Sequence, residues 1–148
     1  MDTIDTIMKS IVNLRVHIAP VGFEVDRIVI PAVSQKADKV WLIAHDNVSE
    51  DKSVKYRENV EKELEKNGIK VEIAYANRLR LSPIIKTVAD IIHKERKNDI
   101  YVNVASGSKI HAIGCMMACM LFDDREKIHP FYAQAEKYPE YDGTLQQT

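Results

Sequence analysis

Short apolar runs rich in β-branched residues alternate with amphipathic segments along the chain, and this alternation constrains the fold more than any other feature. Continuous apolar runs of about six residues are typical of strands that helices cover on both faces. Strands that alternate with helices require right-handed crossovers and hence a parallel sheet. We therefore predict an α/β fold, a Rossmann-like three-layer α/β/α sandwich with a mostly parallel central sheet. The predicted strands are Leu14–Ala19, Lys39–Ala44, Ile69–Ala74, Ile100–Ala105 and Pro130–Ala135.

The helical segments between the strands carry their own start and stop signals. Pro31 is expected to kink or end the first helix, because proline removes a backbone donor inside a helix. Ser82 is predicted to cap the third helix, with Pro83 at its first position. The predicted helices are Glu24–Gln35, Ser49–Asn67, a segment that starts at Ser82-Pro83, and Lys109–Phe122.

The chain has 148 residues and a formal net charge of −1, which leaves room for one domain. We expect a helical extension over residues 1–13, a Rossmann-like domain over 14–135, and a tail or the start of a linker over 136–148. No apolar run approaches the ~20 residues that span a bilayer, and the N-terminus lacks the basic start of a signal peptide. A cytoplasmic protein is therefore expected. The near-zero charge argues against a domain that mainly grips a nucleic-acid backbone.

The last predicted helix is unusually apolar, since His111 is the only strongly polar residue between Ile110 and Phe122. A helix that is apolar all round is normally covered all round, whereas an outer helix of a small sandwich has one face in water. A second copy of the chain is the simplest cover, and burial by helices of the same chain is the alternative. Cys115 and Cys119 lie in this run without a second ligand pair, so we expect buried free cysteines and no zinc site.

A Ser-Gly-Ser loop leads from the fourth predicted strand into a helix that opens on a lysine. Free amides at a helix N-terminus, two hydroxyls and a cation then converge on one small volume, which suits an anionic group such as phosphate. An ordinary turn with a helix cap is the alternative interpretation. The loop, which we call the anion loop, comprises Ser106, Gly107, Ser108 and Lys109. Asn103 at the end of the strand is expected to orient it through hydrogen bonds.

Ligands of parallel α/β sheets bind beyond the carboxyl ends of the strands, so the other loops after strands supply further candidates. Gly22 follows the first strand, where a glycine lets the backbone approach a ligand closely. Phe23 could stack on a base, although a core or interface phenylalanine is the more common outcome. The pattern favours binding over turnover, because no nucleophile elbow is present, and no metal or cofactor is expected. The remaining positional candidates are Val21, His45, Asp46, Asn47, Asn77 and Arg78.

With these residues in view, the chain from about Leu14 to Ala135 resembles the CARF domain, the CRISPR-associated Rossmann-like sensor of cyclic oligoadenylates. It is most similar to the archaeal CARF regulators that carry a winged-helix DNA-binding domain behind the sensor. Pro20-Val21-Gly22-Phe23 matches the first motif of that family. Asn103-Val104-Ala105-Ser106-Gly107-Ser108-Lys109 matches the second, which has a form like Asn-x-Thr-Gly-Gly-Thr-Lys. The sequence departs from that form at Ala105 and Ser106.

The resemblance implies a homodimer in which a two-fold-symmetric ring of adenylates lies across the subunit interface and touches both copies of both motifs. Gly22 and Phe23 would line the pocket, and residues Ser106 to Lys109 would hold phosphates and ribose hydroxyls. DNA would be bound only through a separate winged-helix domain that is not evident in this sequence, and no membrane partner is implied.

The leading hypothesis is thus a sensor domain that binds cyclic tetra-adenylate or a related ring and regulates an effector in CRISPR-linked antiviral defence or its transcription. One alternative is a metal-independent ring nuclease that cleaves the same ligand, with Ser106, Ser108 and Lys109 supplying positioning and charge stabilisation. A further alternative is a Rossmann-like enzyme acting on a mononucleotide or sugar phosphate, because the same anion loop would serve it.

Overall fold

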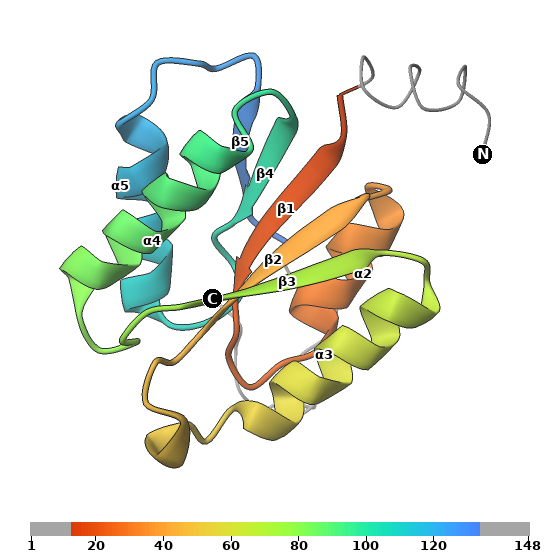
Figure 1. Ribbon diagram of the computed structural model, residues 1–148, viewed down its shortest axis with the longest axis vertical. Coiled ribbons are helices and arrows are strands. Elements are labelled where there is room, and N and C mark those ends of the chain that lie inside the picture. The colour runs from red at the N-terminus through yellow and green to blue at the C-terminus, as the bar shows by residue number, and fades with distance from the viewer. Residues whose placement is uncertain (1–12, 134–148) are drawn as a thin grey trace, which may run out of the picture.

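Within residues 13–133, which the computed structural model describes, the chain forms one five-stranded sheet with the strand order β3-β2-β1-β4-β5 (Figure 1). All neighbouring strands pair in parallel, so the predicted Rossmann-like α/β fold is confirmed. The expected N-terminal helix and C-terminal tail lie outside the described residues. The strands are β1 Arg15–Pro20, β2 Lys39–Ala44, β3 Lys70–Tyr75, β4 Asp99–Asn103 and β5 Ile128–Phe131.

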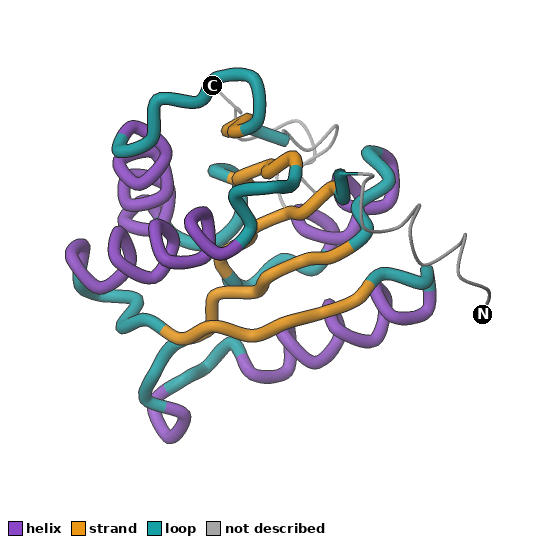
Figure 2. Tube along the Cα trace, turned by 45° about the horizontal axis from the view of Figure 1, so that its top comes forward, coloured by secondary structure: helices purple, strands orange, loops and turns teal. Residues whose placement is uncertain are grey.

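Four α-helices cover the two faces of this sheet, which makes the expected three layers (Figure 2). On one face, α2 (Asp26–Ser34) and α3 (Val54–Lys66) bury apolar side chains against β1 and β2. On the other face, α4 (Leu81–Lys94) and α5 (Lys109–Met120) pack against β1, β2 and β4. Each fully buried aliphatic side chain in these two cores contributes about 2 kcal/mol.

Pro31 does not end α2, which is one of the two outcomes that the sequence predicted for it. The helix continues through Pro31 to Ser34, and Pro31 itself is buried. Proline cannot donate the helical hydrogen bond to the carbonyl of residue 27, but the side-chain Nδ2 of Asn103 donates to that carbonyl at 2.9 Å. The side-chain amide of Asn103, in β4, therefore donates to the carbonyl that the missing backbone amide of residue 31 would otherwise bond.

Two other helix starts differ from the prediction because local turns intervene. The single helix expected over 49–67 is divided into a short 3-10 helix η1 (Val48–Glu50) and α3, because Asp51 is extended and its Oδ1 accepts from the amide of Ser53 at 2.8 Å. Ser82 does not cap α4, which begins at Leu81 behind Arg80 without a side-chain cap. Pro83 is then the third helical residue, where the amide still lacks an intrahelical acceptor.

Helix α5 is buried on one side only. His111, Gly114, Cys115, Ala118 and Cys119 face the protein, and both cysteines are free, as predicted. A Cβ added at Gly114 would lie 2.5 Å from Cγ2 of Ile84, so glycine permits the close approach of α4. Within residues 13–133, the helices of the same chain do not cover the opposite side of α5, where Ile113 is 52% and Met120 is 78% exposed. None of the helices within residues 13–133 is both long and apolar enough to cross a bilayer.

Candidate functional site

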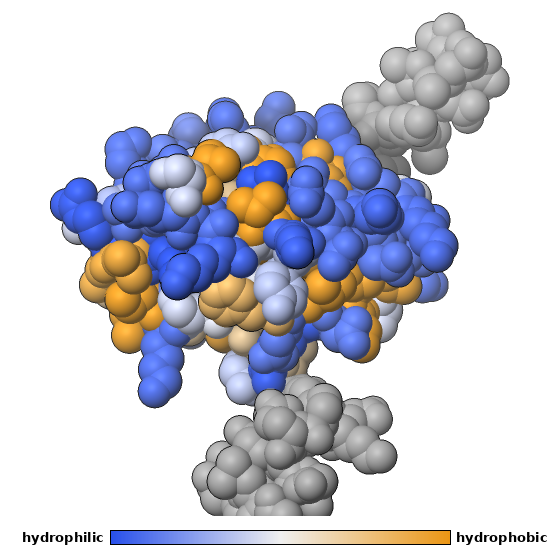
Figure 3. Space-filling model, turned by 90° about the horizontal axis from the view of Figure 1, so that it is seen from below, coloured by the Kyte–Doolittle hydropathy of each residue, from blue (hydrophilic) through white to orange (hydrophobic). Residues whose placement is uncertain are grey.

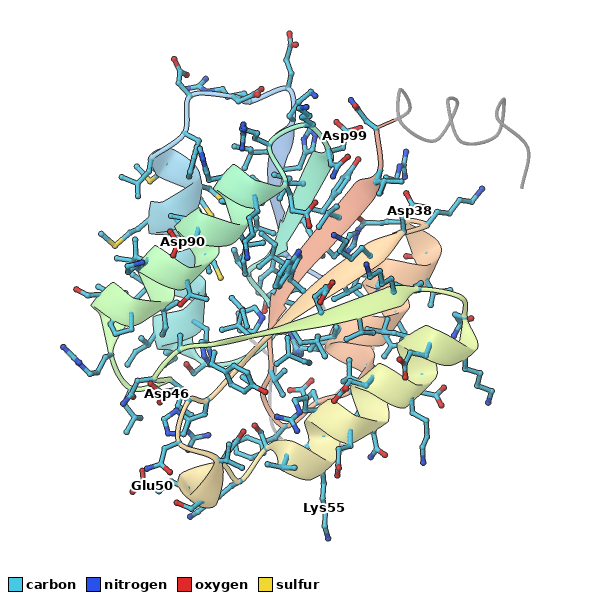
Figure 4. All side chains as sticks on the ribbon, in the orientation of Figure 1. Asp38, Asp46, Glu50, Lys55, Asp90 and Asp99 are labelled. Atoms are coloured by element: carbon cyan, nitrogen blue, oxygen red, sulfur yellow. The ribbon has the colours of Figure 1, made fainter. Side chains whose placement is uncertain are left out.

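The carboxyl edge of the sheet contains a point where the chain changes direction. From β1 the chain passes to β2 and β3 on one side, and later returns to β4 on the other side of β1. Loops diverge at such a switch point and leave a crevice that binds ligands in open α/β sheets. Figure 4 shows Asp46 and Glu50, which follow β2, at this end, and Asp38 and Asp99 at the opposite end.

The loops after β1 and β4 touch each other at two glycines. A Cβ added at Gly22 would lie 3.0 Å from Cα and 3.2 Å from the amide nitrogen of Gly107. Gly107 has a φ of +76°, and a Cβ there would lie 2.9 Å from Cβ of Pro20. Side chains at either position would force the loops apart. The two segments that the sequence singled out are therefore in direct backbone contact at Gly22 and Gly107.

Asn103 positions the second of these loops. Its Oδ1 accepts from the amides of Ala105 at 2.9 Å and Ser106 at 3.0 Å. Its Nδ2 is held by the carbonyl of Arg27 in α2. The side chain is 1% exposed, so these bonds lie out of water and fix the loop to the sheet and to α2 together.

The N-terminus of α5 is capped by a reciprocal pair of side chains. The hydroxyl of Ser108 accepts from the amide of His111 at 3.3 Å, and Nδ1 of His111 accepts from the amide of Ser108 at 3.0 Å. Burial lowers the pKa of His111 to about 4, with smaller contributions from Arg78 and His45. His111 is therefore neutral at pH 7, with its proton on Nε2. Sequence reasoning did not assign this residue to the site, although the Ser-x-x-His spacing of a capping pair was visible.

Two polar groups of the anion loop have no partner in the described part of the chain. The hydroxyl of Ser106 is buried without a hydrogen bond, and no carboxylate there pairs with the exposed Lys109. An unpartnered buried hydroxyl costs about 1–3 kcal/mol. The loop thus contains a buried hydroxyl without a partner and an exposed cation, and both can bond to a ligand oxygen that enters the loop.

A second group of side chains adjoins this loop, contributed by the segments after β1, β2 and β3. The backbone amide of Arg78 donates to Nδ1 of His45 at 3.1 Å. The guanidinium carbon of Arg78 lies 5.8 Å from the centre of the Phe23 ring, and that ring meets the Tyr56 ring edge-on at 5.5 Å. Within residues 13–133 no carboxylate forms an ion pair with Arg78. His45 Nδ1 lies 3.6 Å from Asp46, but the amide of Arg78 already donates to this atom.

Several predicted site residues use their polar atoms or side chains for structure. Val21 is buried in the core under α2 and α3. Oδ1 of Asn47 accepts from the hydroxyl of Ser49, and Oδ1 of Asn77 accepts from the amide of Leu79, so both oxygens stabilise local turns. Asp46 is half-exposed and would repel an anion. The structure brings together the remaining candidates, which are Gly22, Phe23, His45, Arg78, Asn103, Ser106, Gly107, Ser108 and Lys109.

The surface at this edge is mixed rather than uniformly polar. Figure 3 looks onto the edge from below and shows apolar patches between polar side chains. The described part of the chain contains no group of three or more His, Cys, Asp or Glu side chains that could hold a metal ion. The donors gathered here are hydroxyls, amides, a lysine and an arginine, which together suit a phosphate-bearing ligand with an aromatic group.

A protein-family model described as "HFX_2341_N:-like, N-terminal" matches residues 15–138. An uncharacterized protein of Methanocaldococcus jannaschii is 38% identical over 128 residues, which cover 82% of this chain and 38% of the relative. The chain thus spans well under half the length of that relative.

Solved structures with little sequence identity share the fold. Can2 from Sulfobacillus thermosulfidooxidans, in complex with cyclic tetra-adenylate, superposes with a TM-score of 0.67 at 12% identity, over 81% of this chain and 32% of that one. Enterococcus italicus Csm6, bound to cyclic hexa-2′-fluoro-hexa-dAMP, gives a TM-score of 0.61 at 11% identity, over 84% of this chain and 35% of that one. The fold is therefore similar to that of two proteins solved with cyclic oligonucleotides.

Proposed function

The chain belongs to the family described as "HFX_2341_N:-like, N-terminal", and we propose that it is a CARF-like sensor domain that binds a cyclic oligoadenylate at the carboxyl edge of its sheet. Cyclic tetra-adenylate is the first ligand to test, because the Can2 structure of similar fold holds it. The main supporting observation is the pair of loops that meet at Gly22 and Gly107, beside a buried hydroxyl and two cations that have no carboxylate partner within residues 13–133.

The charges at this edge favour an anion. Lys109 and Arg78 supply two positive charges, and the first amides of α5 add the positive end of the helix dipole. Ser106 adds a hydroxyl that is buried without a partner within residues 13–133. A phosphodiester accepts hydrogen bonds on two oxygens, so it can satisfy the hydroxyl and a cation together.

The exposed side of α5 supports a homodimer. Ile113, Met116, Met117 and Met120 recur at helical spacing and are 38% to 78% exposed. A continuous apolar stripe of this kind marks an interface. Lys109 is the first residue of the same helix, so a two-fold axis that runs along α5 would bring the two anion loops together. A two-fold-symmetric ring could then contact both loops.

A ring bound across two subunits would provide a means of regulating an effector. A ring that contacts two subunits stabilises the relative orientation in which both sites meet it, and so shifts the dimer toward that arrangement. The matched part is 38% of the relative from M. jannaschii, so most of that protein lies outside the match. We propose that an attached or partner effector, such as a winged-helix domain, reads this change, and that the chain acts in CRISPR-linked defence.

Calorimetry with cyclic tri-, tetra- and hexa-adenylate tests the ligand. We expect heat with at least one ring, and a loss of affinity of about tenfold or more in Lys109→Ala, because a charge-assisted hydrogen bond to phosphate is removed. Lys66→Ala, an exposed lysine at the far end of α3, is the control and should bind as the wild type does. No heat with any ring, together with binding of AMP or a sugar phosphate, would replace the proposal by a mononucleotide or sugar-phosphate protein.

Cleavage of the ring is a second candidate. The hydroxyl of Ser106 and the amine of Lys109 favour it, because neither has a partner among residues 13–133. In the reaction, a ribose 2′-oxygen bonds to the adjacent phosphorus, the P–O5′ bond breaks, and the 2′-hydroxyl proton ends on the departing 5′-oxygen. Lys109 would stabilise the charge on the phosphorus oxygens. Chromatography after prolonged incubation decides, because a sensor returns the ring intact and a nuclease yields linear adenylates with a 2′,3′-cyclic phosphate.

A further inference from the structure

Phe23 is an exposed aromatic residue in the loop after β1, beside the anion loop. It is 50% exposed, and it directly follows Gly22, the residue whose backbone touches Gly107 of the anion loop. Consecutive Cα atoms lie about 3.8 Å apart. The Cα of Phe23 is therefore one residue away from the backbone contact between Gly22 and Gly107, beside the loop that would hold a phosphate.

The Phe23 ring is held in orientation by its neighbours. The Tyr56 ring meets it edge-on, with the two planes at 89° and the centroids 5.5 Å apart. Edge-to-face pairs of this type are more favourable than their buried area alone accounts for. An aromatic face that is both exposed and fixed is a ready stacking surface, because little side-chain entropy is lost on binding.

Arg78 faces the same ring from the loop after β3. Its guanidinium carbon lies 5.8 Å from the ring centre. Its backbone is fixed by the bond to His45, which is itself buried. Stacked aromatic planes lie about 3.4 Å apart, so a base between ring and guanidinium needs about 7 Å. The flexible arginine side chain must therefore move away from the ring to admit a base.

We propose that Phe23 and Arg78 form a clamp that stacks on both faces of one nucleobase of the ligand, and that this clamp gives the site its affinity for purines. The clamp rests on the proposed function, because it presupposes a nucleotide on the anion loop. It adds a base-recognition element to the phosphate contacts. Purines stack on it more strongly than pyrimidines, since their larger rings cover more of both planes.

Binding of a cyclic tetra-adenylate that carries one 2-aminopurine reports on stacking directly, because stacking quenches the fluorescence of this base. We expect quenching with the wild type, and about tenfold weaker binding with Phe23→Leu, which keeps an apolar side chain and removes the aromatic face. Arg78→Lys keeps the charge and loses the planar group, so it should also bind about fivefold more weakly. Phe23→Trp presents a larger face and should bind at least as tightly, with quenching retained.

Arg80→Lys is the matched control for Arg78→Lys. Arg80 is exposed at the start of α4, and within residues 13–133 its guanidinium makes no cation–π contact with Phe23. If Phe23→Leu and Arg78→Lys bind and quench as the wild type does, the clamp is wrong and the sensor proposal stands. If the wild type binds no cyclic adenylate, both fail. If Arg78→Lys retains wild-type affinity while Arg78→Gln loses it, Arg78 is a phosphate ligand only and the clamp is again refuted.

Discussion

The Asn103→Ala substitution tests how the anion loop is held. It removes three hydrogen bonds, one to the carbonyl of Arg27 and two from the amides of Ala105 and Ser106, at 2.9, 2.9 and 3.0 Å. Each such bond contributes about 1 kcal/mol, and a buried donor left without a partner costs somewhat more. We expect a loss of about 3 kcal/mol in the free energy of unfolding. For a chain of 148 residues this corresponds to a fall of about 10 °C in Tm.

A double-mutant cycle with Pro31→Ala isolates the bond between Asn103 and α2. Alanine at position 31 restores a backbone amide that can donate to the carbonyl of Arg27. In that background Asn103→Ala should cost about 1 kcal/mol less, because one of its bonds has been replaced. Urea denaturation of the four proteins gives the four free energies. Equal cost of Asn103→Ala in both backgrounds would refute the view that this amide substitutes for the one that Pro31 lacks.

Other consequences of the structure can be measured in the same way. Gly107→Ala should lower the free energy of unfolding by about 3 kcal/mol, because its Cβ would lie 2.5 Å from Nδ1 of His111 at a φ of +76°. Gly68→Ala, at a φ of +75° with open space around it, should lower it by only about 1 kcal/mol. Similar losses for the two variants in urea denaturation would contradict this. Burial lowers the pKa of His17 and His111 from 6.5 to about 4, so the unfolded state gains protons first and stability falls from pH 6.5 to 4. The loss between pH 7 and 5 should reach about 2 kcal/mol for each histidine, and a flat pH profile would contradict it. Met117→Glu places a charge on the exposed stripe of α5 and should convert a dimer to a monomer in light scattering, which a persistent dimer would contradict.

Much of the fold was predictable because it depends on local pattern. The run Lys39–Ala44 forms β2 with the predicted bounds, since a buried parallel strand reads as a continuous apolar segment. The continuation of α2 through Pro31 was not predictable. It depends on a hydrogen bond from Asn103, which is distant in sequence and comes close only in the folded sheet.

The candidate site could also be predicted in part from the sequence. Strand ends placed Gly22, Phe23, Arg78 and the anion loop at one edge, because parallel strands align their carboxyl ends. Sequence alone did not show that Val21 turns into the core, because a residue beyond a strand can face either way. It also did not show that His111 is buried beside the loops after β2 and β3, where its pKa falls.

The central claim is that one cyclic adenylate is held between two copies of this chain. Native mass spectrometry of the protein with cyclic tetra- and hexa-adenylate counts both components in one experiment. The account predicts a dominant species of two chains with one ring, which is lost in Lys109→Ala. Single chains that each hold one ring, or two chains that hold none at ligand concentrations in excess of the protein, would contradict it.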